Sequence, residues 1–172
     1  MLFTPFKDHE IDYISIWDPA VDDDALGADG VKEYLETRKI SMLPIREGMK
    51  PITWKIGPID QYSLQYVRST CPEAANGNLV GGVFSYHLCQ IGIRGVKDMH
   101  EGAPTFDTYK DGMLTRVSDD FIKVIPPDMA NELGMLIYSM STAPEEIKKK
   151  SPSRSARKNS KSDTPAKPVR KR

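Results

Sequence analysis

The chain has 172 residues, of which 39% are hydrophobic and 28% charged, as is typical of one folded domain with a polar extension. Its 24 basic and 24 acidic residues give zero net charge, but residues 148–172 carry 11 basic residues and one acidic residue, which leaves 13 basic and 23 acidic residues in 1–147. The sequence has neither a run of 18 apolar residues nor the apolar core of a secretory signal, so we expect no membrane span and no export.

The first predicted elements are a strand over residues 12–17 and a helix over residues 29–38. In the strand, polar and apolar side chains alternate, and Pro19 follows its end. The helix has apolar residues spaced three and four apart and basic residues at its end. Between the two, residues 22–24 are all Asp. They lack the spacing of a calcium-binding loop, so we expect a solvated acidic loop.

A second strand is predicted over residues 52–56, because Ile52, Trp54 and Ile56 share one face. Pro58 suits the first turn of a helix, which we predict over residues 59–71.

The longest apolar segment, residues 77–96, favours a central helix with a broad apolar face. Gly81 and Gly82 count against it, because a glycine in a helix interior costs about 1 kcal/mol relative to alanine. A strand over residues 83–86 is the alternative.

A hairpin is predicted around residues 110–112, where Asp-Gly favours a tight turn. A short helix over 118–124 and a longer one over 128–141 follow, the second with a regular apolar stripe. We therefore predict an α+β fold: a mostly helical single domain over residues 1–143, with a small sheet or hairpin.

Residues 144–172 are predicted to form a disordered basic tail, because Lys, Arg, Ser and Pro dominate and apolar side chains are scarce. Its cations could bind phosphates or an acidic partner without reading a base sequence. The tail has no aromatic residue that could stack on a base. The candidate binding residues are Lys148, Lys149, Lys150, Arg154, Arg157 and Lys158. A solubilising extension, or an arm that folds onto the acidic body, is the alternative.

The residues that could carry chemistry form no recognisable motif. On a helix, His87 and Cys89 would point about 200° apart, so they could not bind one ion together. A Cys–His nucleophile pair remains open from the sequence alone. No glycine-rich phosphate loop is present. We predict no cofactor, no metal site and no catalytic activity, and a reducing compartment in which Cys71 and Cys89 are thiols.

Several segments together resemble small tailed-bacteriophage proteins that are described as tail assembly chaperones. The resemblance covers about residues 18–146 and excludes the basic tail. It is carried by DPAVD, EYLETR, EGMKPITWKI, CQIGIRGVKDMHEG and SDDFIKVIPPDMANELGMLIYSMSTAPEE.

The resemblance implies a virion-assembly protein of the host cytoplasm that binds a tape-measure or tail-tube component without catalysis. Such a protein needs an apolar docking face for its partner or for a second copy of itself. Methionine suits such faces because its side chain is flexible, and the alternative is that the methionines simply fill the core. The candidates are Met113, Met129, Met135, Tyr138 and Met140. The alternatives are a virion structural protein of the capsid, neck or tail, and a nucleic-acid-binding protein that uses the basic tail.

Overall fold

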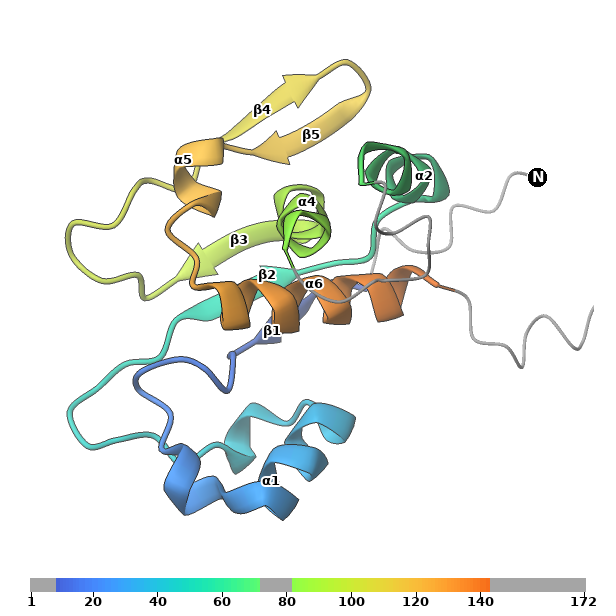
Figure 1. The fold of residues 1–172 in the computed structure, drawn as a ribbon. Helices are drawn as coiled ribbons and strands as arrows, with labels where there is room; N and C mark the ends of the chain where they lie inside the picture. Colours follow the sequence, from blue (N-terminus) through green and yellow to red (C-terminus); the bar gives the residue numbers. More distant parts are fainter. Residues whose placement is uncertain (1–8, 72–81, 143–172) are drawn as a thin grey trace, which may run out of the picture. The chain divides into compact units, whose positions relative to one another are not determined.

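A computed structural model describes residues 9–71 and 82–142 of the chain. Three short strands form an antiparallel sheet in the order β1-β2-β3 (Figure 1). In the central strand, Trp54 is paired with Tyr13 on one side and with Val96 on the other. The strands are β1 (Ile11–Tyr13), β2 (Thr53–Ile56) and β3 (Ile93–Lys97).

The two faces of this sheet differ in chemistry. Trp54 and Ile56 are buried, whereas Lys55 between them is exposed. On the exposed face, Lys97 Nζ lies 3.1 Å from Asp12 Oδ2. The alternation along β2 therefore places one face of the sheet in the core and leaves a charged face in solvent.

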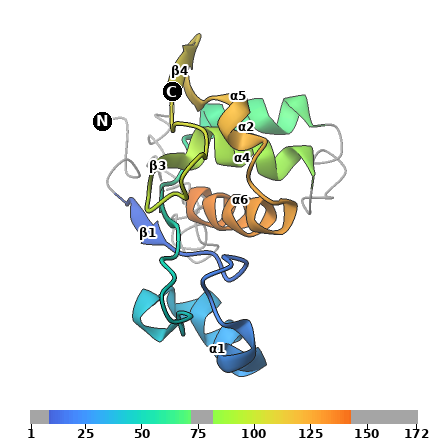
Figure 2. The same ribbon diagram turned by 90° about the vertical axis from the view of Figure 1, so that its left-hand side faces the viewer.

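Three helices lie on one side of the sheet (Figure 2). They are α2 (Gln61–Thr70), α4 (Val83–Gly92) and α6 (Pro127–Ser141). Asp60 caps α2, because its Oδ1 accepts a hydrogen bond from the Ser63 N–H at 2.7 Å. Pro127 opens α6 at a position where a missing N–H has no cost. The core is formed between these helices and the sheet.

Helix α1 (Asp23–Thr37) and the 3-10 turn η1 (Ile40–Met42) lie beyond the end of β1 (Figure 1). Tyr34 anchors α1, because its buried ring stacks on Tyr13 with centroids 5.5 Å apart. Its hydroxyl also donates a hydrogen bond to the Ile14 carbonyl at 2.6 Å.

A hairpin and a short helix complete the described fold. Strands β4 (Thr108–Asp111) and β5 (Leu114–Val117) are joined at Gly112, whose φ of 60° favours glycine. Helix α5 (Asp119–Ile122) follows directly. Leu114 and Phe121 are buried and attach this segment to the core.

The predicted α+β class is confirmed, with helices dominating and a small antiparallel sheet. The central helix predicted over 77–96 is wrong in its last four residues, because α4 (83–92) ends at Gly92 and residues 93–97 pair with β2. The β-branched Ile93 and Val96 suit that strand. The alternative strand over 83–86 is also wrong, since those residues form the first turn of α4. Residues 77–81 lie outside the described ranges.

The N-terminal predictions need two corrections. The strand predicted over 12–17 ends at Tyr13, and a turn follows in which the Asp18 N–H donates to the Ser15 carbonyl. The acidic residues 22–24 do not form a loop. Asp22 caps α1, and Asp23 and Asp24 occupy its first turn, where their charge suits the helix dipole. The chain leaves helical geometry only at Gly27.

Candidate functional site

An apolar pocket of about 330 Å³ lies between β2, α5 and the start of α6. We call it the Trp54 pocket. Its size is at the lower end of the range for ligand sites. It is lined mainly by apolar side chains, among them Trp54, Met99, Phe121, Val124, Ile125 and Met129, together with the polar side chain of His100.

Trp54 is the unusual member of this lining. Its side chain is buried and makes an edge contact with Phe121, with ring centroids 6.2 Å apart. The indole Nε1–H is buried and has no hydrogen-bond partner among the described residues. Buried tryptophan N–H groups usually find an acceptor, and leaving one unsatisfied costs about 1–3 kcal/mol. A ligand that brings an acceptor to this N–H would recover that energy.

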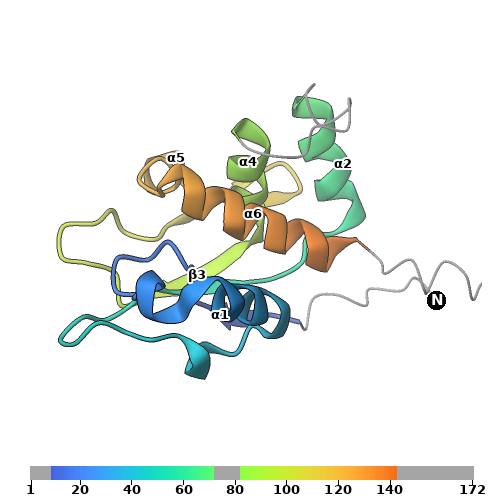
Figure 3. The ribbon, with the colours of Figure 1, turned by 60° about the horizontal axis from the view of Figure 1, so that its bottom comes forward.

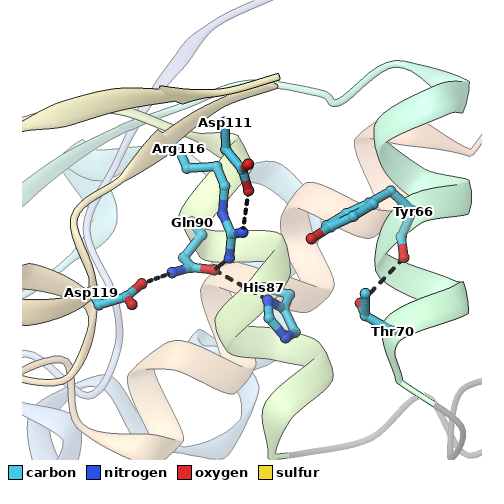
Figure 4. Close-up of polar contacts among 7 residues, drawn as sticks. All are labelled: Tyr66, Thr70, His87, Gln90, Asp111, Arg116 and Asp119. Carbon is cyan, nitrogen blue, oxygen red and sulfur yellow. Dashed lines mark hydrogen bonds and ion pairs between the residues drawn. The ribbon is translucent and has the colours of Figure 1, made fainter. Parts of the chain in front are cut away.

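A second site is a polar cluster centred on Gln90, a buried residue of α4 (Figure 4). The Gln90 amide donates to Asp119 Oδ1, and its oxygen accepts from Arg116 NH2. Arg116 NH1 also donates to Asp111 Oδ2 at 2.9 Å. Burial is the largest single influence on Arg116 and lowers its pKa, but the hydrogen bond to Asp111 and the nearby Tyr109, Tyr66 and Asp111 together raise the pKa of Arg116 above its ordinary value. These contacts join the hairpin and α5 to α4.

The same contacts determine which ring nitrogen of His87 is the hydrogen-bond donor. Arginine can only donate and an ionised carboxylate can only accept, so the Gln90 oxygen must face Arg116. His87 Nδ1 lies 3.1 Å from that oxygen and must therefore carry the proton. When the ring is neutral, Nε2 is then the acceptor. On α2, Tyr66 points its hydroxyl toward the cluster (Figure 4).

A third cluster surrounds Glu132 on α6. Its carboxylate accepts hydrogen bonds from the Tyr13 hydroxyl at 2.5 Å, from the Ser15 hydroxyl and from the Ile16 N–H at 3.3 Å. Burial raises the pKa of Glu132, and these donors oppose that rise. The cluster fixes the end of β1 against α6.

The predicted docking residues do not form one face. Met129 is buried and lines the Trp54 pocket from inside the core, so it does not belong to an exposed docking surface. Tyr138 packs edge-on against Phe84 and accepts a hydrogen bond from Arg68 at 2.8 Å. Met135 is 36% exposed and Met140 is partly buried.

Met113, at the tip of the hairpin, is 87% exposed. The predicted tail residues Lys148, Lys149, Lys150, Arg154, Arg157 and Lys158 lie outside the described ranges.

The structure separates the residues considered for metal or nucleophile chemistry. Cys89 is buried against α6, where its Sγ lies 3.4 Å from the Ala130 carbonyl, while His87 turns to Gln90. Burial raises the pKa of Cys89 to about 12, which keeps the thiol protonated at neutral pH. The carboxylates of Asp22, Asp23 and Asp24 come within 4.8 Å of one another. Exposed acidic groups at a helix start need no ion to explain them.

Sequence reasoning missed both Trp54 Nε1 and the Gln90 cluster. Gln90 lies three residues after His87, and on a helix this spacing predicts that the two side chains are neighbours. Arg116 comes from another element, and no local pattern indicates that pairing. Within the two described ranges, no helix has the length and apolar character needed to cross a membrane.

Comparisons of the chain with protein-family models, curated proteins and solved structures found no match.

Proposed function

We propose that this protein is a non-catalytic assembly factor that binds an apolar segment of another polypeptide in the Trp54 pocket. The observation that carries the proposal is the buried Nε1–H of Trp54, which has no acceptor among the described residues and belongs to a lining that is apolar except for His100. Such a site requires an apolar group to fill the pocket and an acceptor for the indole N–H. A peptide has both, since its apolar side chain can fill the pocket while a neighbouring backbone carbonyl accepts the hydrogen bond from the indole.

The lining favours a flexible recognition of apolar side chains. Met99 and Met129 line the pocket on different elements, and methionine adapts to side chains of different shape. Val124, also in the lining, is 50% exposed, so an incoming chain could reach the pocket from solvent. A site of this kind suits a protein that shields apolar segments before they assemble.

The resemblance to phage tail assembly chaperones supports the biological setting. We accordingly propose a tape-measure or tail-tube component as the partner and the host cytoplasm as the place of action. Binding without bond-making is part of this proposal. The neutral thiol of Cys89 and the mutually paired Gln90 cluster both support it.

Binding of a ligand to the Trp54 pocket can be measured through the fluorescence of Trp54 itself. A Trp17→Phe background leaves one tryptophan, and N-acetyl-leucine N-methylamide serves as the probe. Binding should change Trp54 fluorescence, and the alanine analogue should bind more weakly by about 1–3 kcal/mol because it buries less apolar surface. A Val124→Glu change places a charge at the pocket and should abolish binding.

Val83→Glu is the matched control, because Val83 is 59% exposed and lies outside this pocket. It should leave probe binding unchanged. Equal loss in both variants, or equal affinity for the two analogues, would contradict the pocket assignment.

The partner is tested by co-expressing the full chain with the tape-measure or tail-tube protein encoded beside its gene. Co-purification that Val124→Glu abolishes and Val83→Glu preserves is the expected result. Abundant peptides of this chain in purified particles would favour a virion structural protein instead. Retardation of DNA that disappears on truncation at Ser151 would favour the nucleic-acid-binding alternative.

A further inference from the structure

A separate pocket of about 300 Å³ is lined by residues from the end of α1 and from α6. We call it the Arg38 pocket. Figure 3 shows the two helices that supply these residues. Leu35 and Arg38 line it from the end of α1, and Met135 and Leu136 line it from α6. Leu35 is 43% exposed and Met135 is 36% exposed, so two large apolar side chains border a site that also contains a cation.

The Arg38 side chain has no hydrogen-bond or ion-pair partner in the part of the chain that the structure describes, and its Nε is buried there. Arg38 also has a φ of 57°, in the left-handed region where glycine is the usual residue at a helix end. That conformation costs a side-chain-bearing residue roughly 1–2 kcal/mol, yet an arginine occupies the position.

The acidic residue in the same pocket does not neutralise Arg38. Both oxygens of Glu132 already accept hydrogen bonds, from Tyr13, from Ser15 and from the Ile16 N–H. Among the described residues no ion pair joins Glu132 to Arg38, so the guanidinium keeps its capacity to bind an outside carboxylate through two parallel hydrogen bonds.

We propose that the Arg38 pocket binds a carboxylate that neighbours an aliphatic side chain on a partner polypeptide. The carboxylate pairs with Arg38, and the aliphatic side chain packs between Leu35 and Met135. Charge complementarity selects this occupant. A polyanion such as nucleic acid would be repelled by the acidic body, in which residues 1–147 carry 23 acidic and 13 basic residues. A single carboxylate on an apolar segment meets much less repulsion. The site is distinct from the Trp54 pocket and goes beyond the proposed function.

The test uses the ¹⁵N-labelled full chain and two peptides, acetyl-Leu-Glu-Leu-amide and its Gln counterpart. We expect the Glu peptide to shift the amide resonances of Leu35, Arg38 and Met135 at concentrations of about 1 mM. The Gln peptide should bind about tenfold more weakly, because it lacks the charge-assisted pair. Equal binding of the two peptides, or no shift at these residues, overturns the proposal.

Variants assign the selectivity to Arg38. Arg38→Gln should abolish the preference for the Glu peptide, and Arg38→Lys should retain part of it. Arg46→Gln is the control, because Arg46 is exposed and already paired with Asp23 at 3.3 Å. It should keep the full preference. If thermal unfolding shows that Arg38→Gln is unstable, Arg38→Lys still tests the assignment, because its preference for the Glu peptide should lie between that of the wild type and no preference. If every variant binds the Glu peptide with the affinity of the wild type, the assignment to Arg38 is overturned.

Two further outcomes separate this site from its alternatives. Shifts at Leu35 and Met135 that depend on protein concentration without peptide would identify a second copy of the chain as the occupant and overturn the proposal. Val124→Glu, which blocks the Trp54 pocket, should leave the peptide preference intact. Failure at one pocket is therefore distinguishable from failure at the other.

Discussion

Gly134 on α6 lies directly against the backbone of Ser85 on α4. A Cβ placed on Gly134 would lie 2.9 Å from the Ser85 Cα and 3.0 Å from its carbonyl oxygen. Backbone atoms cannot move aside as the end of a flexible side chain can. The same two helices also meet at Gly92, where a Cβ would lie 2.5 Å from Ile137 Cγ2. The close approach of α4 and α6 therefore depends on glycine at both positions.

We predict that Gly134→Ala destabilises the protein by about 1–3 kcal/mol, because the added methyl forces two packed helices apart. Chemical denaturation of the wild type and the variant measures the change. The control is Gly30→Ala on α1, where the new methyl would meet only the Leu26 side chain at 3.0 Å. Helix propensity gains up to about 1 kcal/mol there, so that variant should be neutral or stabilised. Equal effects at both positions would contradict the packing argument.

The second prediction concerns Glu132 and pH. Burial raises its pKa above the ordinary 4.5, so above pH 4.5 the folded state holds a proton that the unfolded state has lost. The free energy of unfolding contributed by Glu132 should therefore be largest below that pH and fall as pH rises. Relative to Glu132→Gln, the wild type should lose stability between pH 4.5 and neutrality.

Denaturation curves at a series of pH values measure this difference. Glu36→Gln is the control, because Glu36 is exposed on α1, and its difference from wild type should stay nearly constant. A wild type that gains stability over Glu132→Gln as pH rises would show that the three donors to the carboxylate outweigh its burial.

The elements that sequence reasoning placed well are those whose signals are local. Pro127 begins α6, and the Asp111-Gly112 turn joins β4 to β5. In both cases the local signal is a residue with restricted or permissive backbone geometry, and in α6 it coincides with a clear hydrophobic period. No distant contact was needed to predict them.

The predictions were wrong where contacts between distant residues determine the secondary structure. The sequence of residues 77–96 predicts one apolar helix, yet α4 ends at Gly92 and Ile93 begins a strand whose residues pair with β2. The candidate sites fall in the same class. Within the described ranges, Trp54 Nε1 and the Arg38 side chain have no partner because of what surrounds each of them in the fold, and no residue spacing along the chain predicts those surroundings.

The third prediction concerns the reactivity of Cys89. Because the thiol is buried and its pKa is raised to about 12, a thiol reagent should reach it only after unfolding. In a Cys71→Ala variant, which leaves Cys89 alone, the rate of labelling should follow the rate or extent of unfolding in denaturant. Rapid labelling of the native protein at neutral pH would show an accessible thiolate and reopen a nucleophilic role.

The last prediction concerns the Gln90 cluster. Gln90→Leu removes the group that joins Arg116 to Asp119, so the hairpin and α5 lose a shared attachment to α4. With polar partners left unsatisfied near the core, we expect a loss of about 1–3 kcal/mol in unfolding free energy. Amide hydrogen exchange should also accelerate in β4 and β5 before it does in α6, because α6 takes no part in the cluster.

Gln65→Leu is the control, because Gln65 is an exposed residue of α2, and it should change the free energy of unfolding by no more than about 0.5 kcal/mol. Uniform acceleration over the whole fold would show that Gln90 supports global packing and not the attachment of the hairpin.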